Sequence, residues 1–179
     1  MKLIVLDRDG VINHDSDEYI KSPEEWLPIE GSLEAIARLN HGGYTVVVAS
    51  NQSGLARKYF DIDSLTAMHK KMDDMLAKIG GRVDAVFYCP HGPDDDCDCR
   101  KPKPGMLLEI GRRFNVPLKE VVFIGDSISD IKAASNASAQ AMLVRTGKGE
   151  KAEKIIKLEC KESVPVHDNL ADAVTAILQ

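Results

Sequence analysis

Two aspartates, Asp7 and Asp9, stand one residue apart, directly after four apolar residues and just before a glycine. Alternate residues of an extended chain project to the same side. Two carboxylates held that close repel each other unless a proton or a cation is shared between them. The pattern therefore favours metal-assisted or acid–base chemistry, with an ordinary aspartate-rich turn as the alternative if these two residues are taken alone.

Further polar side chains follow other apolar runs of the chain. Ser50 and Asn51 end a valine-rich run, Lys101 comes after a third run, and Asp126 and Asp130 follow a fourth. Mg²⁺ prefers carboxylate and other oxygen ligands. A phosphoryl group in transfer needs cations and N–H donors around its oxygens, and an aspartate can attack it to form an aspartyl-phosphate. Together these groups predict a Mg²⁺-dependent phosphoryl-transfer site.

Alternating strand and helix patterns must position these side chains. Strands are expected at 3–6, 44–49, 83–88, 121–124 and 141–144, with a short edge strand at 164–166. Helices are expected at 33–41, 63–79 and 106–114, then up to about 136, and at 151–158 and 169–178, the first capped by Ser32. Such alternation is typical of an α/β doubly wound, mostly parallel sheet with helices on both faces, here one domain over 1–179. Ligands of these sheets bind at the carboxyl ends of the strands.

Composition limits the kinds of partner. The chain has 179 residues and a net charge of −5, which argues against nucleic acid or an acidic membrane surface as the main partner. No apolar run approaches the roughly 18 residues of a membrane span, and the sequence opens on a strand pattern rather than a signal peptide. We therefore expect a cytoplasmic monomer that acts on a small molecule, with no nucleic-acid or membrane partner.

The stretch 13–31 shows no clean periodicity and is longer than a typical α/β connection. Long connections of this kind are usually functional or disordered. Because it leaves directly from the Asp7 and Asp9 turn, we expect a loop or lid that faces the substrate. Its plausible contacts are Asp15, Ser16 and Tyr19, and a solvated insertion is the alternative.

Three cysteines and one histidine lie within an acidic segment of eleven residues: Cys89, His91, Cys97 and Cys99. Crowded cysteines without a secretory signal favour metal binding over disulfides, and this set matches a closed structural Zn²⁺ site. Since a closed site offers no open position to a substrate, the zinc loop at about 89–99 is expected to position Arg100 and Lys101. Redox-active or unrelated cysteines are the alternative, and Cys160 is expected to be a lone thiol.

The order of these groups resembles the four motifs of the haloacid dehalogenase superfamily of phosphotransferases. The matching segments are Asp7–Gly10, Ser50, Lys101–Pro104 and Gly125–Asp130. The resemblance covers nearly the whole chain, which has no room for a large inserted cap domain. It implies that Asp7 attacks phosphorus, while Asp9 protonates the leaving alkoxide and then deprotonates the hydrolytic water.

The same resemblance implies the ligands of the metal and of the phosphoryl group. Mg²⁺ would bind Asp7, the backbone carbonyl of Asp9 and Asp126, with Asp130 just outside the ligand set. Ser50 and Lys101 would hold the phosphoryl oxygens.

The zinc segment, followed at once by Arg-Lys-Pro, resembles a narrower branch of histidinol-phosphate and D-glycero-D-manno-heptose 1,7-bisphosphate phosphatases. The motifs are most similar to the heptose branch, which implies removal of the 7-phosphate in ADP-heptose and lipopolysaccharide synthesis. The substrate contacts implied there, besides the 13–31 loop, are Ser50, Asn51, Gln52, Ser53, Arg100 and Lys101. Arg57 is available for a second phosphate.

Three other functions remain open. Histidinol-phosphate phosphatase would use the same catalytic residues. A polynucleotide 3′-phosphatase is disfavoured by the net charge and by the lack of a basic stripe with aromatic residues. A non-catalytic, zinc-stapled binding module is disfavoured because it would have no need of both Asp7 and Asp9.

Overall fold

The computed structural model describes residues 1–159 and 163–179. Cys160 lies outside these residues, so its prediction as a lone thiol is not addressed by the structure. The strands are β1 (Lys2–Leu6), β2 (Tyr44–Asn51), β3 (Ala85–Cys89), β4 (Val122–Gly125), β5 (Gln140–Val144) and β6 (Val166–His167). The helices are α1 (Ser32–His41), α2 (Ile62–Ala77), α3 (Gly105–Phe114), α4 (Ile128–Asn136), α5 (Gly149–Glu159) and α6 (Leu170–Leu178), with a 3₁₀ turn at Leu118–Glu120.

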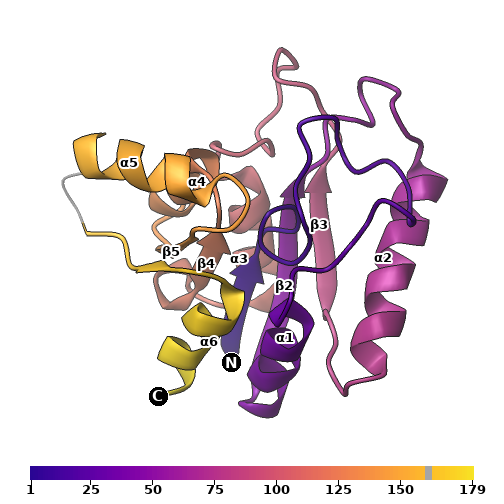
Figure 1. The fold of residues 1–179 in the computed structure, drawn as a ribbon. Coiled ribbons are helices and arrows are strands. Elements are labelled where there is room, and N and C mark those ends of the chain that lie inside the picture. The colour runs from indigo at the N-terminus through magenta and orange to yellow at the C-terminus, as the bar shows by residue number, and fades with distance from the viewer. Residues whose placement is uncertain (160–162) are drawn as a thin grey trace.

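The six strands form one parallel sheet in the spatial order β3-β2-β1-β4-β5-β6. The chain first builds outward from β1 to β3, then crosses to β4 on the other side of β1. The order therefore reverses between β1 and β4, which is where open α/β sheets bind ligands, outside the carboxyl ends of the strands. The connections after β1, β2 and β3 rise from this edge (Figure 1), and the predicted fold class is confirmed.

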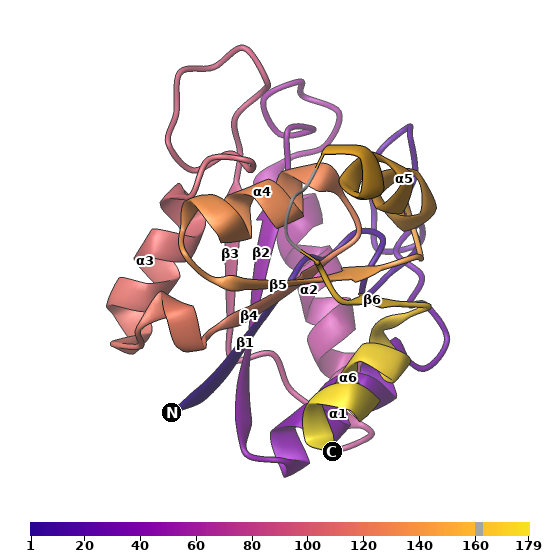
Figure 2. The ribbon, with the colours of Figure 1, turned by 90° about the vertical axis from the view of Figure 1, so that its left-hand side faces the viewer.

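Apolar side chains alternate between the two faces of the sheet. Ile4 and Leu6 of β1 pack with α1, α2 and α6, whereas Leu3 and Val5 pack with α3 and α4 on the opposite face. Helix α5 extends this second layer through a smaller cluster with α4 and β5 (Figure 2). Since each inner strand is covered on both sides, its apolar run is continuous rather than alternating. None of the described helices is long and apolar enough to cross a bilayer.

The loop 13–31 is anchored to the core at several buried points, although residues 16–18 between them are exposed. Trp26 is fully buried within it, and the Lys71 ammonium of α2 donates to the carbonyls of Pro23 and Trp26, each at 2.7 Å. The His14 N–H donates to the Leu27 carbonyl at 2.9 Å. Burial of one large aromatic side chain stabilises such a segment by roughly 1.5–3 kcal/mol, so the alternative of a floppy insertion is wrong.

Several local expectations need correction. Strand β3 begins at Ala85, two residues later than expected, and α2 ends at Ala77, two residues earlier. Ser32 does not cap α1: Gly31 holds the capping position without a side-chain bond, and the Ser32 hydroxyl donates to the Val11 carbonyl at 2.9 Å. The edge strand begins two residues later than expected, at Val166, because its pairing with β5 is Leu143 to Val166 and Val144 to His167.

Candidate active site

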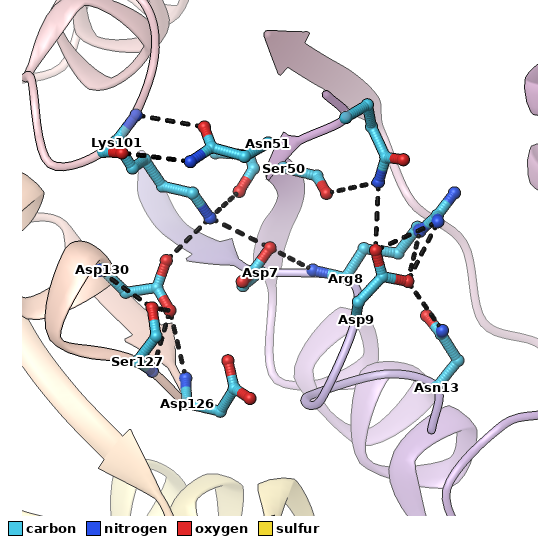
Figure 3. A network of polar contacts seen from close by, with 12 residues as sticks. Asp7, Arg8, Asp9, Asn13, Ser50, Asn51, Lys101, Asp126, Ser127 and Asp130 are labelled. Atoms are coloured by element: carbon cyan, nitrogen blue, oxygen red, sulfur yellow. Dashed lines mark hydrogen bonds and ion pairs between the residues drawn. The ribbon is translucent and has the colours of Figure 1, made fainter. Parts of the chain in front are cut away.

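Lys101 lies at the centre of the site, buried between the ends of β1, β2 and α4 (Figure 3). Its ammonium contacts Asp7 Oδ1 at 3.0 Å and Asp130 Oδ1 at 2.7 Å, and donates to the Ala49 carbonyl at 2.8 Å. An ammonium has three protons to donate, so all three have partners. Asn51 fixes the backbone of Lys101 from both sides, accepting from its N–H at 3.0 Å and donating to its carbonyl at 3.1 Å.

Asp7 continues β1 past its end, because its N–H donates to the Ile124 carbonyl at 2.9 Å. Its carboxylate also accepts from the Arg8 N–H at 2.7 Å. Burial and the charge of Asp130 raise the pKa of Asp7 well above its ordinary value, and Lys101 offsets this only in part. Burial alone would lower the pKa of Lys101, but Asp130 and Asp7 outweigh it and raise it. The site thus holds more negative charge than its one buried lysine neutralises.

Asp126 and Asp130 come from the turn into α4 and have different surroundings. Both oxygens of Asp130 are engaged: Oδ1 with Lys101, and Oδ2 with the Ser127 hydroxyl at 2.7 Å and the Asp126 N–H at 3.2 Å. Asp126 accepts from the Lys148 N–H at 2.8 Å through Oδ2. Burial and Asp130 raise the pKa of Asp126 to about 7. Asp7, Asp126 and Asp130 bring carboxylate oxygens within 4.8 Å of one another.

Two glycines press against the Asp126 carboxylate. A Cβ on Gly10 (φ +84°) would lie 2.1 Å from Asp126 Oδ2, and a Cβ on Gly147 (φ +59°) would lie equally close. Thr146 ties the two turns together, since its hydroxyl donates to the Gly10 carbonyl at 2.6 Å. Only a residue without a side chain fits at these positions. The packing of Gly10 and Gly147 against Asp126, called the clamp below, fixes the direction of the carboxylate.

Asp9 is held in a cradle of donors. Arg8, whose side chain is fully buried, donates through Nε to Oδ1 at 3.0 Å and through Nη2 to Oδ2 at 3.1 Å. Asn13 donates to Oδ1 at 2.8 Å and Gln52 to Oδ2 at 3.1 Å. His69 Nε2 lies 3.4 Å from Arg8 Nη1. A guanidinium only donates, so this ring nitrogen accepts and His69 is neutral, with its proton on Nδ1.

A cavity of about 300 Å³ opens over these groups. The predicted substrate contacts in its lining are Asp15, Ser16, Tyr19, Ser50, Asn51, Gln52, Ser53, Arg100 and Lys101. Tyr19 packs edge-on against Tyr59 with ring centroids 5.1 Å apart, which joins the loops that follow β1 and β2. Arg57 is not in this lining, so the structure does not place it beside the other predicted contacts.

The four predicted zinc ligands form a second cluster. Cys89, His91, Cys97 and Cys99 each offer a ligand atom within 4.8 Å of the others. Cys89 Sγ lies 3.8 Å from Cys97 Sγ and 3.1 Å from Cys99 Sγ, and His91 Nδ1 lies 3.3 Å from Cys99 Sγ. The cysteines are free rather than disulfide-bonded. Atoms bound to one ion at about 2.0–2.3 Å would stand at similar separations, so the donor set fits zinc.

Sequence reasoning missed several residues that shape the site. Lys148, Ser127 and Ser129 line the cavity, and Arg8 and Asn13 hold Asp9. The segment 146–148 follows β5, and the rule that ligands bind at carboxyl ends of strands would have flagged it. The charges of the segment from Lys148 to Glu162 suggest only a solvated helix face in the sequence.

Fold and site together define a phosphatase of the HAD-like hydrolase class. A family model described as HAD-hydrolase-like matches residues 98–173. A crystal structure from B. bronchiseptica, "D,D-heptose 1.7-bisphosphate phosphatase … complexed with magnesium and phosphate", superimposes with a TM-score of 0.96 at 52% identity and covers 100% of this chain and 99% of that one. A second, from Burkholderia thailandensis, has a TM-score of 0.79 at 42% identity, with 100% and 99% coverage.

The sequence relatives agree with the structures. D-glycero-beta-D-manno-heptose-1,7-bisphosphate 7-phosphatase of Pseudomonas aeruginosa is 52% identical over 177 residues, which is 99% of this chain and 98% of that protein. The enzyme of Pasteurella multocida is 40% identical and covers 82% of this chain and 83% of its own length. The chain belongs to the family of these heptose bisphosphate phosphatases.

Proposed function

We propose that this protein removes the 7-phosphate of D-glycero-D-manno-heptose 1,7-bisphosphate through an aspartyl-phosphate on Asp7. The observation that carries the proposal is the buried cluster of Asp7, Lys101, Asp126 and Asp130 at the reversal point of the sheet. The full-length similarity of this chain to heptose 1,7-bisphosphate phosphatases supports the choice of sugar. By the same likeness we propose a place in ADP-heptose and lipopolysaccharide synthesis, and a monomer in the cytoplasm.

The carboxylates fit a magnesium site, because Asp7, Asp126 and Asp130 bring oxygens within 4.8 Å of one another and the pKa values of Asp7 and Asp126 are raised. Asp7, Asp126 and the Asp9 backbone carbonyl would hold Mg²⁺. Asp130 already uses both oxygens in hydrogen bonds and ion pairs, so its role is to orient Lys101 and the turn of Asp126. When bound, Mg²⁺ would withdraw charge from the phosphoryl oxygens and relieve repulsion among the carboxylates.

Asp7 is the proposed nucleophile, since its carboxylate is anchored by the Arg8 N–H and by Lys101. Ser50 and Lys101 would bind oxygens of the phosphoryl group. One N–H of the Lys101 ammonium would then be shared between its acceptor in the protein and a phosphoryl oxygen. Asp9 would give a proton to the leaving sugar oxygen and then take one from the attacking water. The cradle of Arg8, Asn13 and Gln52 keeps Asp9 in position for both steps.

We propose that Zn²⁺ on Cys89, His91, Cys97 and Cys99 is structural. Burial raises the pKa of the Cys89 thiol to about 12 in the metal-free cluster, so a bound cation is what would stabilise the thiolate there. The segment leads directly into Arg100 and Lys101, which connects the metal to the site through the chain.

One cation of the cavity lining supports a bisphosphate. Arg100 lies outside the ion pairs that Lys101 makes with Asp7 and Asp130, so its guanidinium is available for a second phosphate. The alternative, histidinol phosphate, is favoured by Asp15 and Asp17, whose carboxylates at the cavity could receive an amine. Arg57 is retained only as a weaker candidate for the second phosphate.

The test is phosphate release with Mg²⁺ on both anomers of heptose 1,7-bisphosphate, histidinol phosphate and a 3′-phosphorylated oligonucleotide. We expect kcat/KM at least about a hundredfold higher on one bisphosphate anomer, a difference of roughly 2.7 kcal/mol. Phosphorus NMR of the product should show that the phosphate on carbon 1 remains. Preference for histidinol phosphate would overturn the substrate and leave the site chemistry in place.

A further inference from the structure

Lys148 connects two parts of the site that are far apart in the sequence. Its backbone N–H donates to Asp126 Oδ2 at 2.8 Å, and its ammonium forms an ion pair with Asp15 Oδ2 at 3.3 Å. Asp126 is a proposed magnesium ligand, and Asp15 belongs to the loop that follows β1. One residue therefore bridges the metal side of the cavity and the loop at its entrance.

The backbone of Lys148 has little freedom to move. The preceding residue, Gly147, packs so closely against Asp126 and Gly10 that a Cβ would collide with both. The Thr146 hydroxyl donates to the Gly10 carbonyl at 2.6 Å. Helix α5 begins directly after it, at Gly149. Because the backbone of Lys148 is held by these contacts, its side chain can fix the position of Asp15. A lysine on a mobile loop would move together with its partner.

The contact also borders two cavities. Lys148 and Asp15 line the catalytic cavity and also a neighbouring cavity of about 550 Å³ between the loop and α5. The Asp15 side chain is 19% exposed and that of Lys148 is 55% exposed. Without the ammonium, Asp15 and Asp17 would face an anionic substrate with their charge uncompensated.

We propose that Lys148 is a positioning residue for the reaction, acting through Asp15. Its ion pair forms a latch, defined as the Lys148–Asp15 contact, that holds the loop 13–31 in place at the cavity entrance and neutralises Asp15. The proposal deepens the phosphatase function proposed above and rests on it for its kinetic effects. Its structural effect, the order of the loop, does not depend on activity.

The kinetic test compares Lys148→Met with Lys151→Met on the preferred sugar phosphate. Lys151 is on the same helix and lines the neighbouring cavity but not the catalytic one, so its variant removes an equal charge nearby. We expect Lys148→Met to raise KM roughly two- to fivefold with kcat nearly unchanged, the size of a half-exposed ion pair. Lys151→Met should stay within twofold, and Lys148→Arg should restore most of the loss.

Adding Asp15→Asn separates the latch from direct phosphate binding. If Lys148 acts through Asp15, the fold-change in KM of the double variant should be well below the product of the fold-changes of the two single variants. If the two effects multiply, Lys148 contacts the substrate on its own and the proposal is wrong.

Hydrogen exchange provides a readout that needs no turnover. In Lys148→Met, amides of residues 14–20 should exchange faster, while those of α2 should not change. Unchanged exchange in the loop would overturn the latch even if the enzyme is fully active. A wild-type protein that hydrolyses no phosphate ester would instead overturn the proposed function, and the exchange result would still decide the latch.

Discussion

Replacing Gly147 with alanine should uncouple Asp126 from the site. A Cβ there would lie 2.1 Å from Asp126 Oδ2 and 2.7 Å from Gly10 Cα, so the carboxylate has to move by about an ångström. A misplacement of that size in a catalytic group costs on the order of a hundredfold in rate. The positive φ of +59° adds about 1–2 kcal/mol of backbone strain for any residue with a Cβ.

Gly43 supplies the matched control. It has a φ of +80° but nothing within 4 Å of its would-be Cβ, so Gly43→Ala carries the strain without the collision. Gly43→Ala should lose about 1–2 kcal/mol of unfolding free energy in urea titrations, and Gly147→Ala should lose more because its Cβ also collides with Asp126 and Gly10. Only Gly147→Ala should lose about a hundredfold in kcat/KM and need more Mg²⁺ for half-saturation.

Steady-state phosphate release over a Mg²⁺ titration measures both effects. Wild-type kcat/KM and Mg²⁺ dependence in Gly147→Ala would refute the clamp on Asp126. An equal loss of activity in Gly43→Ala would show that strain or instability, rather than the carboxylate, explains the result.

Three further predictions follow from the same geometry. Asp7→Asn should abolish turnover while thermal unfolding and zinc content stay near wild type; loss of zinc, measured by plasma mass spectrometry, would contradict the separation of the two metal sites. Burial, with a smaller contribution from Arg8, lowers the pKa of His69 to about 4. Below pH 6.5 the unfolded chain therefore binds a proton that the folded one resists, and stability falls toward pH 4, by at most about 3.4 kcal/mol. His69→Gln should flatten this slope in urea titrations over that range, and an unchanged slope would remove His69 as its source. Cys99→Ser should lower zinc content and raise KM, because Arg100 and Lys101 follow the cluster directly; full zinc occupancy with normal kinetics would show that three ligands suffice.

The central features of the site could be predicted from sequence because they follow from local pattern. Buried apolar runs identify parallel strands, and polar residues at the ends of such runs meet at one edge. That reasoning placed Asp7, Lys101, Asp126 and Asp130 together. In the structure Lys101 contacts Asp7 and Asp130, and Asp126 brings a carboxylate oxygen within 4.8 Å of theirs. The cysteine spacing likewise placed four donors in one cluster.

What could not be predicted depends on contacts between distant segments. Arg8 stands between two aspartates, and nothing local shows that its side chain is fully buried and bonded to Asp9. In the sequence His69 looks like a plain surface or packing histidine, yet its ring contacts Arg8. Trp26 sits in an aperiodic stretch, so its burial is set by α2 rather than by its neighbours.

Ser32 shows how a sound local rule can fail. A serine at the start of a helical pattern favours a cap, but here the Val11 carbonyl needed a donor in the interior. The buried bond determined the role of the hydroxyl, and α1 begins after Gly31 without a side-chain cap.

The most direct test of the account is to trap the phosphoryl group on Asp7. In Asp9→Asn, an activated ester such as p-nitrophenyl phosphate needs no proton for its leaving group, so the first step should proceed while hydrolysis of the aspartyl-phosphate slows. Acid quenching and peptide mass spectrometry should then find a phosphoryl group on the peptide that holds Asp7. Turnover without phosphorylation of that peptide, or a phosphoryl group on another residue, would contradict Asp7 as the nucleophile.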